Sequence, residues 1–154
     1  MATSNQPNVS RGSAPFDLMG AIDESLAEGV YAVDCNGNLI FLNRAAERAL
    51  GWTEKELLGK NMHEVIHYKR PDGRPFPVEE CPLLEVLRTG EVRASDEDHF
   101  VRRDGTTFPV AYTSSPIIAD GKIAGAVVAF RDVTETKRIE RELREQKETL
   151  ETVS

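Results

Sequence analysis

The sequence lacks long apolar segments, an excess of positive charge and a patterned set of cysteines. Its longest apolar runs are far too short to cross a bilayer, and no N-terminal segment has the order of a signal peptide. The net charge of −7 argues against a nucleic-acid partner, because contact with a phosphate backbone requires a basic face. Cys35 and Cys81 form no metal or redox spacing. We therefore expect a cytoplasmic chain in a reducing compartment, although a cytoplasmic part of a membrane-bound parent would look the same.

Recognisable catalytic patterns are absent as well. No Ser-His-Asp set, glycine-rich phosphate loop or regularly spaced metal-ligand cluster occurs. Carboxylates are plentiful, but they lie in helical and turn contexts where a solvated surface explains them. We therefore expect that the chain is not an enzyme and that it has no metal site.

The 154 residues suit one domain with extensions. Residues 1–15 are small and polar, which predicts a disordered lead. Residues 16–28 are expected to form an N-terminal amphipathic helix that ends at Gly29. Its apolar residues are spaced three and four apart, at Phe16, Met19, Ile22 and Leu26.

Residues 29–133 have the pattern of an α+β core. Two β-prone runs flank Asn36-Gly37, and three more are joined by Asp104-Gly105 and Asp120-Gly121. Between these two groups lie short helical segments, with capping residues at Asn43 and Thr53. The order predicts one five-stranded antiparallel sheet, with the middle helices covering one face and enclosing a space. Its strands are expected to begin near Val30, Leu39, Asp98, Thr106 and Lys122, with Pro109 at an edge or a bulge.

Residues 134–154 are predicted to form a C-terminal coiled-coil helix that begins directly after the last strand. Thr134 suits the N-cap position. An a/d seam with charges nearly everywhere else indicates a parallel homodimer, whereas a solvated terminal helix that frays is the alternative. The seam comprises Thr136, Ile139, Leu143, Gln146, Leu150 and Val153, of which Ile139, Leu143, Leu150 and Val153 are the apolar contacts.

Three motifs in this order resemble the PAS domain, a sensory module. They are "NRAAERALGW" (43–52), "RRDGTTFPV" (102–110) and "FRDVTE" (130–135). The resemblance implies a five-stranded antiparallel sheet with flanking short helices, a pocket between them, dimerisation, and an attached effector such as a histidine kinase. It also implies that Asp132, Thr134 and Glu135 couple the sheet to the output helix. On this basis the pocket is expected to be lined by Leu57, Val65, Leu84, Val110, Tyr112 and Val127.

The cofactor, if there is one, is left open by the sequence. Light-sensing members of the family carry a cysteine that attacks flavin, and Met62 occupies that position here, which excludes a flavin–cysteine adduct. Haem is an alternative, because His63 and His67 are one turn apart on a helix and Cys81 follows, and all three are haem-ligand types. Ordinary hydrogen-bonded histidines and a small core cysteine explain the same residues.

The function we expect is that of a PAS sensory and dimerisation module that passes a conformational signal to its C-terminal helix. The alternatives are a haem-binding gas or redox sensor, and a structural dimerisation module without a ligand. A small-molecule ligand is compatible with the first interpretation. The loop at 67–82 is either a lid over the pocket or simply a longer connection.

Overall fold

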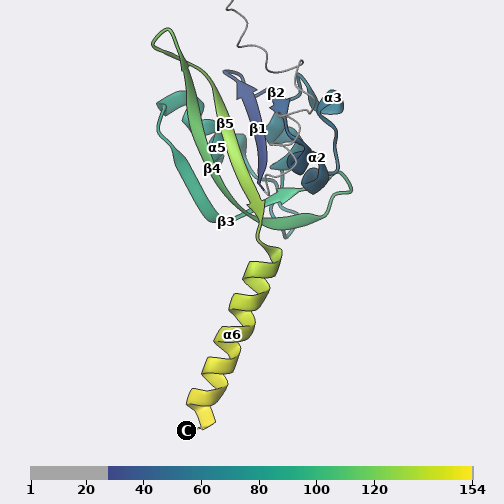
Figure 1. Cartoon of the computed structure of the whole chain (residues 1–154), viewed down its shortest axis with the longest axis vertical. Coiled ribbons are helices and arrows are strands. Elements are labelled where there is room, and N and C mark those ends of the chain that lie inside the picture. The colour runs from purple at the N-terminus through teal and green to yellow at the C-terminus, as the bar shows by residue number, and fades with distance from the viewer. Residues whose placement is uncertain (1–27, 154) are drawn as a thin grey trace, which may run out of the picture.

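A computed structural model describes residues 28–153, with side chains placed for residues 28–151. The predicted lead at 1–15 and all but the last residue of the helix predicted for 16–28 lie outside this part of the chain. The described strands form one five-stranded antiparallel sheet in the order β2-β1-β5-β4-β3 (Figure 1). Their bounds are β1 Gly29–Asp34, β2 Leu39–Leu42, β3 Arg93–Val101, β4 Thr107–Ala119 and β5 Lys122–Asp132.

The two hairpins meet in the middle of the sheet. Gly37 closes the first hairpin with a φ of 83°, as the Asn-Gly pair predicts. β1 then pairs with β5, with Tyr31 opposite Val128. The expected single sheet is therefore confirmed. Gly125 is essential to this contact, because a Cβ there would lie 2.1 Å from the carbonyl oxygen of Val33.

Short helices cover one face of the sheet (Figure 1). Two of them begin at the predicted capping residues, because Asn43 caps α2 and Thr53 forms a capping box with Glu56 on α3. Gly90 ends α5 in the left-handed conformation. Their apolar residues pack onto the sheet to form one hydrophobic core. The helices are α2 Arg44–Leu50, α3 Glu54–Leu57, α4 Met62–Ile66, the 3-10 turn η3 Val78–Glu80 and α5 Pro82–Thr89.

The face of β5 that points inward differs from the expectation. Val128 and its neighbours two residues away, Ala126 and Phe130, are buried, whereas Val127 and Ala129 are half-buried on the opposite face. The assignment of Val127 to the interior is therefore wrong. The cause is that this run is apolar at every position, so its sequence contains no alternation that would show which side chains face inward. β4 does alternate, and Phe108, Val110 and Tyr112 are buried as expected.

Pro109 lies where β4 has only one neighbour. It is opposite His99 of β3, while pairing of β4 with β5 begins one residue later, at Val110. The missing N–H of proline therefore removes no hydrogen bond from an interior ladder. β4 is an interior strand as a whole, but this segment of it is a local edge.

α6, Thr134–Val153, leaves the end of β5 and extends away from the sheet (Figure 1). Only Val133 separates its first residue from the last residue of β5. Among the described residues, no helix is long and apolar enough to cross a membrane.

Candidate functional site

Three potential ligand side chains converge beneath the sheet. Asn61 caps α4 by accepting from the backbone N–H of Glu64, and the short helix turns His63 and His67 inward. Cys81 is the residue before α5. All three are buried, with exposed fractions of 6% for His63, 0% for His67 and 3% for Cys81. One donor atom from each residue lies within 4.8 Å of the other two.

His67 is held at both ring nitrogens. Its Nδ1 lies 3.2 Å from the Cys81 sulfur, and its Nε2 lies 3.0 Å from a carboxylate oxygen of Asp98 on β3. The hydroxyl of Tyr112 donates to the same Asp98 oxygen at 3.0 Å. A continuous hydrogen-bonded chain therefore joins the start of α5 at Cys81 and the end of α4 at His67 to β3 and β4.

His63 has one engaged and one unengaged nitrogen. Its Nε2 lies 2.8 Å from the carbonyl oxygen of Phe76. Its Nδ1 is buried and has no hydrogen-bond partner among the described residues. A buried polar atom without a partner is costly and calls for an explanation, such as a functional role or a bound water or ion.

The environment favours a thiolate–imidazolium pair. Burial acts to raise the pKa of Cys81, but the neighbouring imidazole rings of His63 and His67 outweigh it and lower that pKa to about 6. Burial acts to lower the pKa of His67, but hydrogen bonds to Asp98 and Cys81 raise it to about 9. The pKa of Asp98 stays below its usual value despite burial, because His67 donates to it.

The loop at 67–82 covers these groups. The ring of Phe76 lies 4.4 Å from that of His67, centroid to centroid, and Arg70 stacks on the outer side of Phe76 at 4.3 Å. A backbone bridge between Lys69 and Pro75 closes the loop. The loop therefore acts as a cover over the histidines, which the sequence had left open.

The interior next to this cluster is nearly filled. Its cavity has a volume of about 10 Å³, which is room for about one water molecule. Ligand pockets for drug-sized molecules are on the order of 300–1,000 Å³, so the donor types suit haem iron but the space does not suit a haem. The lining consists of Tyr31, Val33, Met62, His63, His67, Cys81, Leu83, Leu84, Ala126 and Val128.

The residues predicted to line the pocket differ in where the structure places them. Leu84 does line the cavity. Leu57, Val110 and Tyr112 are buried in the core, and Val65 is partly buried against it. Met62 lines the cavity, and a thioether cannot form the thiolate that a flavin adduct requires.

The predicted coupling residues lie at the junction of β5 and α6. Asp132 accepts hydrogen bonds from the backbone N–H of Thr134 at 2.8 Å and from its hydroxyl at 2.5 Å. Thr134 is the first residue of α6, so the carboxylate of Asp132, rather than the hydroxyl of Thr134, caps the helix. Glu135 pairs with Arg138 in the first turns.

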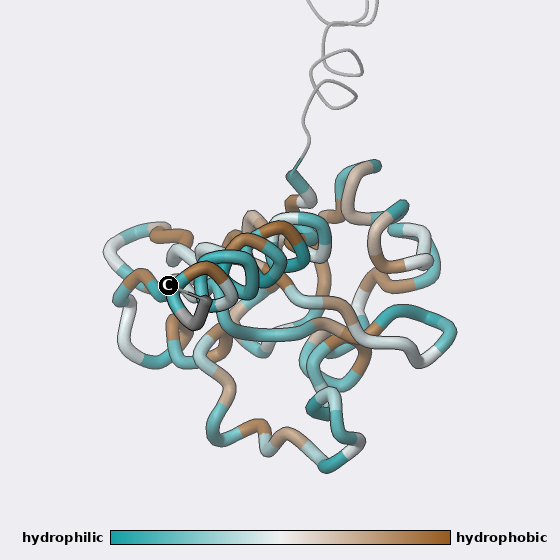
Figure 2. Tube along the Cα trace, turned by 90° about the horizontal axis from the view of Figure 1, so that it is seen from below, coloured by the Kyte–Doolittle hydropathy of each residue, from teal (hydrophilic) through white to brown (hydrophobic). Residues whose placement is uncertain are grey.

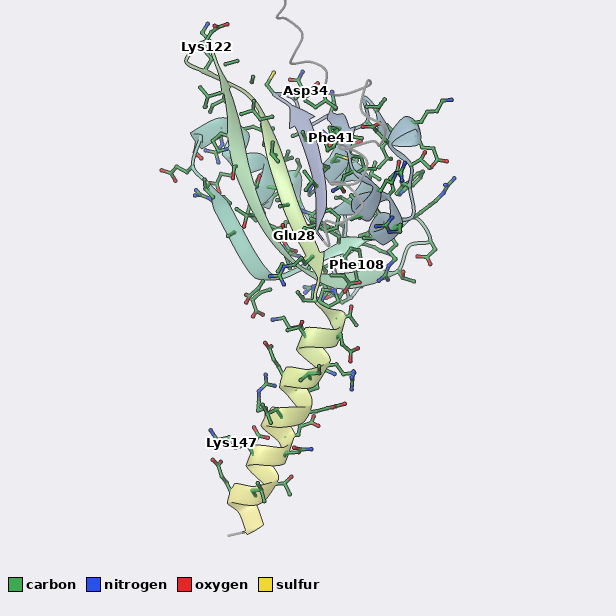
Figure 3. All side chains as sticks on the ribbon, viewed as in Figure 1. Glu28, Asp34, Phe41, Phe108, Lys122 and Lys147 are labelled. Atoms are coloured by element: carbon green, nitrogen blue, oxygen red, sulfur yellow. The ribbon has the colours of Figure 1, made fainter. Side chains whose placement is uncertain are left out.

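Two ion pairs connect this junction to β3 and to the residue that follows β3. Arg102 contacts Asp132 at 3.3 Å and stacks on Phe108, which lies at the end of the sheet where α6 begins (Figure 3). Lys137 of α6 contacts Glu97 at 3.3 Å. Glu97 precedes Asp98, at an irregularity in the pairing of β3 with β4. β3, whose Asp98 is hydrogen-bonded to His67, therefore also contacts the start of α6 through Glu97.

The apolar seam of α6 is exposed. Ile139, Leu143 and Leu150 have exposed fractions of 52%, 65% and 71%. Hydrophobic segments recur along one side of the helix when the molecule is viewed from below (Figure 2). Val153, the last predicted seam residue, lies beyond the described side chains.

Sequence reasoning missed the partners of the histidines. Asp98 is 31 residues from His67, and Phe76 is 13 residues from His63. Asp98 occurs in the acidic run "SDED", whose composition alone indicates a solvated strand. The signal that could have identified it is the inward phase of β3, two residues before the buried Phe100.

Comparison with known proteins relates this chain to modules of signalling proteins. A family model described as PAS fold matches residues 17–133. The probable diguanylate cyclase DgcE of Escherichia coli (strain K12) is 30% identical over 124 residues, covering 78% of this chain and 11% of that protein. The signal transduction histidine-protein kinase AtoS of the same strain is 32% identical over 126 residues, covering 82% and 19%. The chain thus spans a fifth or less of the length of these two relatives.

Solved structures share the fold at low sequence identity. The PAS domain of nitrogen regulation protein NR(II) from Vibrio parahaemolyticus has a TM-score of 0.59 at 20% identity, covering 76% of this chain and 99% of that one. The LOV domain of the Erythrobacter litoralis EL346 blue-light activated histidine kinase has a TM-score of 0.58 at 24% identity, covering 71% and 98%. The family match, the sheet order and these neighbours agree: the chain belongs to the PAS family of sensory domains found in signalling proteins.

Proposed function

We propose that the chain is a sensory and dimerisation module that passes a conformational change from its interior network to α6, and from there to an attached effector such as a histidine kinase. The observation that carries this proposal is the joint between β5 and α6, where one residue separates the sheet from a helix that extends away from it. A joint without slack transmits a rotation or shift of the strand instead of absorbing it.

The route from the interior to the helix is short. Asp98 receives the hydrogen bond of His67, and the adjacent Glu97 pairs with Lys137 of α6. Exposed ion pairs contribute little to stability, so this pair serves to orient the helix rather than to hold it. A change in the state of His67 would shift β3 and thereby alter the angle at which α6 leaves the sheet.

Dimerisation is proposed from the exposed seam of α6. Burying a leucine side chain stabilises an assembly by about 1.5–3 kcal/mol, and the seam offers Ile139, Leu143 and Leu150 in one stripe. A second copy presents the same stripe, so a parallel two-fold arrangement covers both. The relatives support the output side, since they include a histidine kinase and a probable diguanylate cyclase.

A structural dimerisation module without a ligand is the second candidate. The small interior cavity favours it, because a volume of about 10 Å³ offers no ready space for a metabolite. The two candidates share the dimer and differ in whether the interior network has two states.

The dimer is tested by replacing Leu143 with glutamate. This change places a charge in the seam, and we expect the mass measured by light scattering to fall from dimer toward monomer while the sheet stays folded. Arg144→Gln is the matched control, because it also lowers the charge by one unit at a neighbouring exposed position outside the seam. Equal masses for the protein and both variants would contradict a dimer built on α6.

A further inference from the structure

We infer that His63, His67 and Cys81 form a zinc-binding site, with Cys81 Sγ and the two histidine Nδ1 atoms as ligands and water in the fourth position. This goes beyond the proposed function, which holds or fails separately. Only the use of the metal as an input signal would rest on that function.

The donor set and its spacing support the site. One atom from each of three buried residues lies within 4.8 Å of the others, and two imidazoles with one thiolate are ligands that zinc prefers. With Zn–S near 2.3 Å and Zn–N near 2.0 Å, a tetrahedral site needs ligand atoms about 3.5 Å apart. The separation of His67 Nδ1 from Cys81 Sγ is 3.2 Å, so a small opening brings this pair to that distance.

The unengaged nitrogen of His63 is the second, independent observation. Its Nε2 already faces the Phe76 carbonyl, so Nδ1 is the atom left to coordinate. That Nδ1 is buried without a hydrogen-bond partner among the described residues. A bound cation would satisfy it, whereas the present arrangement leaves the cost of its burial uncompensated.

The surroundings orient the ligands as metal sites require. When the Nδ1 atom of a histidine binds zinc, its Nε2–H commonly donates to a carboxylate, which fixes the ring. His67 has this arrangement, with Nε2 at 3.0 Å from Asp98, and Tyr112 holds the carboxylate in turn. The carbonyl of Phe76 plays the corresponding part for His63.

Binding of the metal releases one proton. The metal takes the place of the Nδ1 proton between His67 and the Cys81 thiolate, and this proton leaves to solvent. The thiolate keeps its charge and passes from a hydrogen bond to a metal bond. The ion would lie between the three ligand atoms, and the neighbouring cavity of about 10 Å³ has room for the water in the fourth position but none for a larger cofactor.

The test uses cobalt as a spectroscopic substitute for zinc in the Cys35→Ser background, which leaves Cys81 as the only thiol. We expect one Co²⁺ per chain, with a thiolate-to-cobalt charge-transfer band that added Zn²⁺ abolishes. Cys81→Ser should abolish this band. His63→Gln, which keeps an amide donor for the Phe76 carbonyl, should weaken binding by about tenfold or more.

The control is His99→Gln, which removes the third histidine, on β3 and outside the cluster. It should bind cobalt as the background protein does. If Cys81→Ser does not fold, two other observations decide: the charge-transfer band of the background protein and the weaker cobalt binding of His63→Gln. Folded background protein without a charge-transfer band, or binding unaffected by His63→Gln, would overturn the site. Neither outcome bears on the mass of the dimer.

Discussion

Cys81 shows how neighbouring groups decide the chemistry of one residue. In an apolar interior a free cysteine is a small hydrophobe whose thiol keeps its proton. Here His63 and His67, the latter supported by Asp98, reverse that preference and lower the pKa of Cys81 to about 6. The other cysteine, Cys35, is exposed and lies outside this network.

We therefore predict that the Cys81 thiol loses its proton at an unusually low pH. In the Cys35→Ser background and without metal, the ultraviolet absorbance of the thiolate should rise around pH 6. The stability contributed by the thiolate is lost as the pH falls through about 6, because the folded pKa of Cys81 lies below its ordinary value of 9.0. The contribution of the His67 proton is lost as the pH rises through about 9, so the pair stabilises the fold most between these two values. His67→Gln should raise the pKa, because the burial cost remains while the positive partner is gone. A thiol that titrates identically in both proteins would contradict the pair.

At the scale of elements, the start of α6 depends on a carboxylate from the preceding strand. Asp132 both caps the helix through Thr134 and pairs with Arg102. Two variants distinguish the cap from the ion pair. Asp132→Ala removes both and should reduce the free energy of unfolding by about 1 kcal/mol, with a loss of helical signal from α6.

Asp132→Asn is the matched comparison. Asparagine is a good N-cap, so this variant should retain the helix while losing the ion pair with Arg102. Circular dichroism and urea unfolding measure both quantities. If the asparagine variant loses as much helix as the alanine variant, the ion pair rather than the cap holds the start of α6.

Local signals explain which elements were predictable. Glycine turns such as Asn36-Gly37, the Thr53 capping box and the alternation of Phe108, Val110 and Tyr112 act within a few residues, and the structure follows them. β5 was predicted as a strand but not in phase, because apolar residues on both faces leave no alternation to read.

The interior network was predictable only in part. The sequence indicated His63, His67 and Cys81 as a group, since helical spacing and the nearby cysteine are local features. It could not indicate Asp98 or Phe76, because those partners are brought in by strand pairing and by the course of a loop. The size of the cavity likewise depends on how all the lining side chains pack, which no local pattern determines.

On the scale of the whole molecule, residues 28–153 comprise a packed core and an extended helix that projects from it (Figure 3). Interior groups and α6 meet through β3, since Asp98 faces the core while Glu97 contacts Lys137. If the module transmits signals, a change confined to Asp98 must be detectable in the helix. A core that is merely a scaffold would absorb the same change locally.

Amide hydrogen exchange across α6 tests this claim most directly. Asp98→Asn removes the charge that faces His67, and we predict that it alters exchange in β3 and in the first two turns of α6. Asp96→Asn makes the same chemical change at an exposed position of the same strand and should leave α6 unaffected. Identical exchange of α6 in all three proteins, or a uniform acceleration over the whole sheet, would contradict a signal that passes from the interior to the helix.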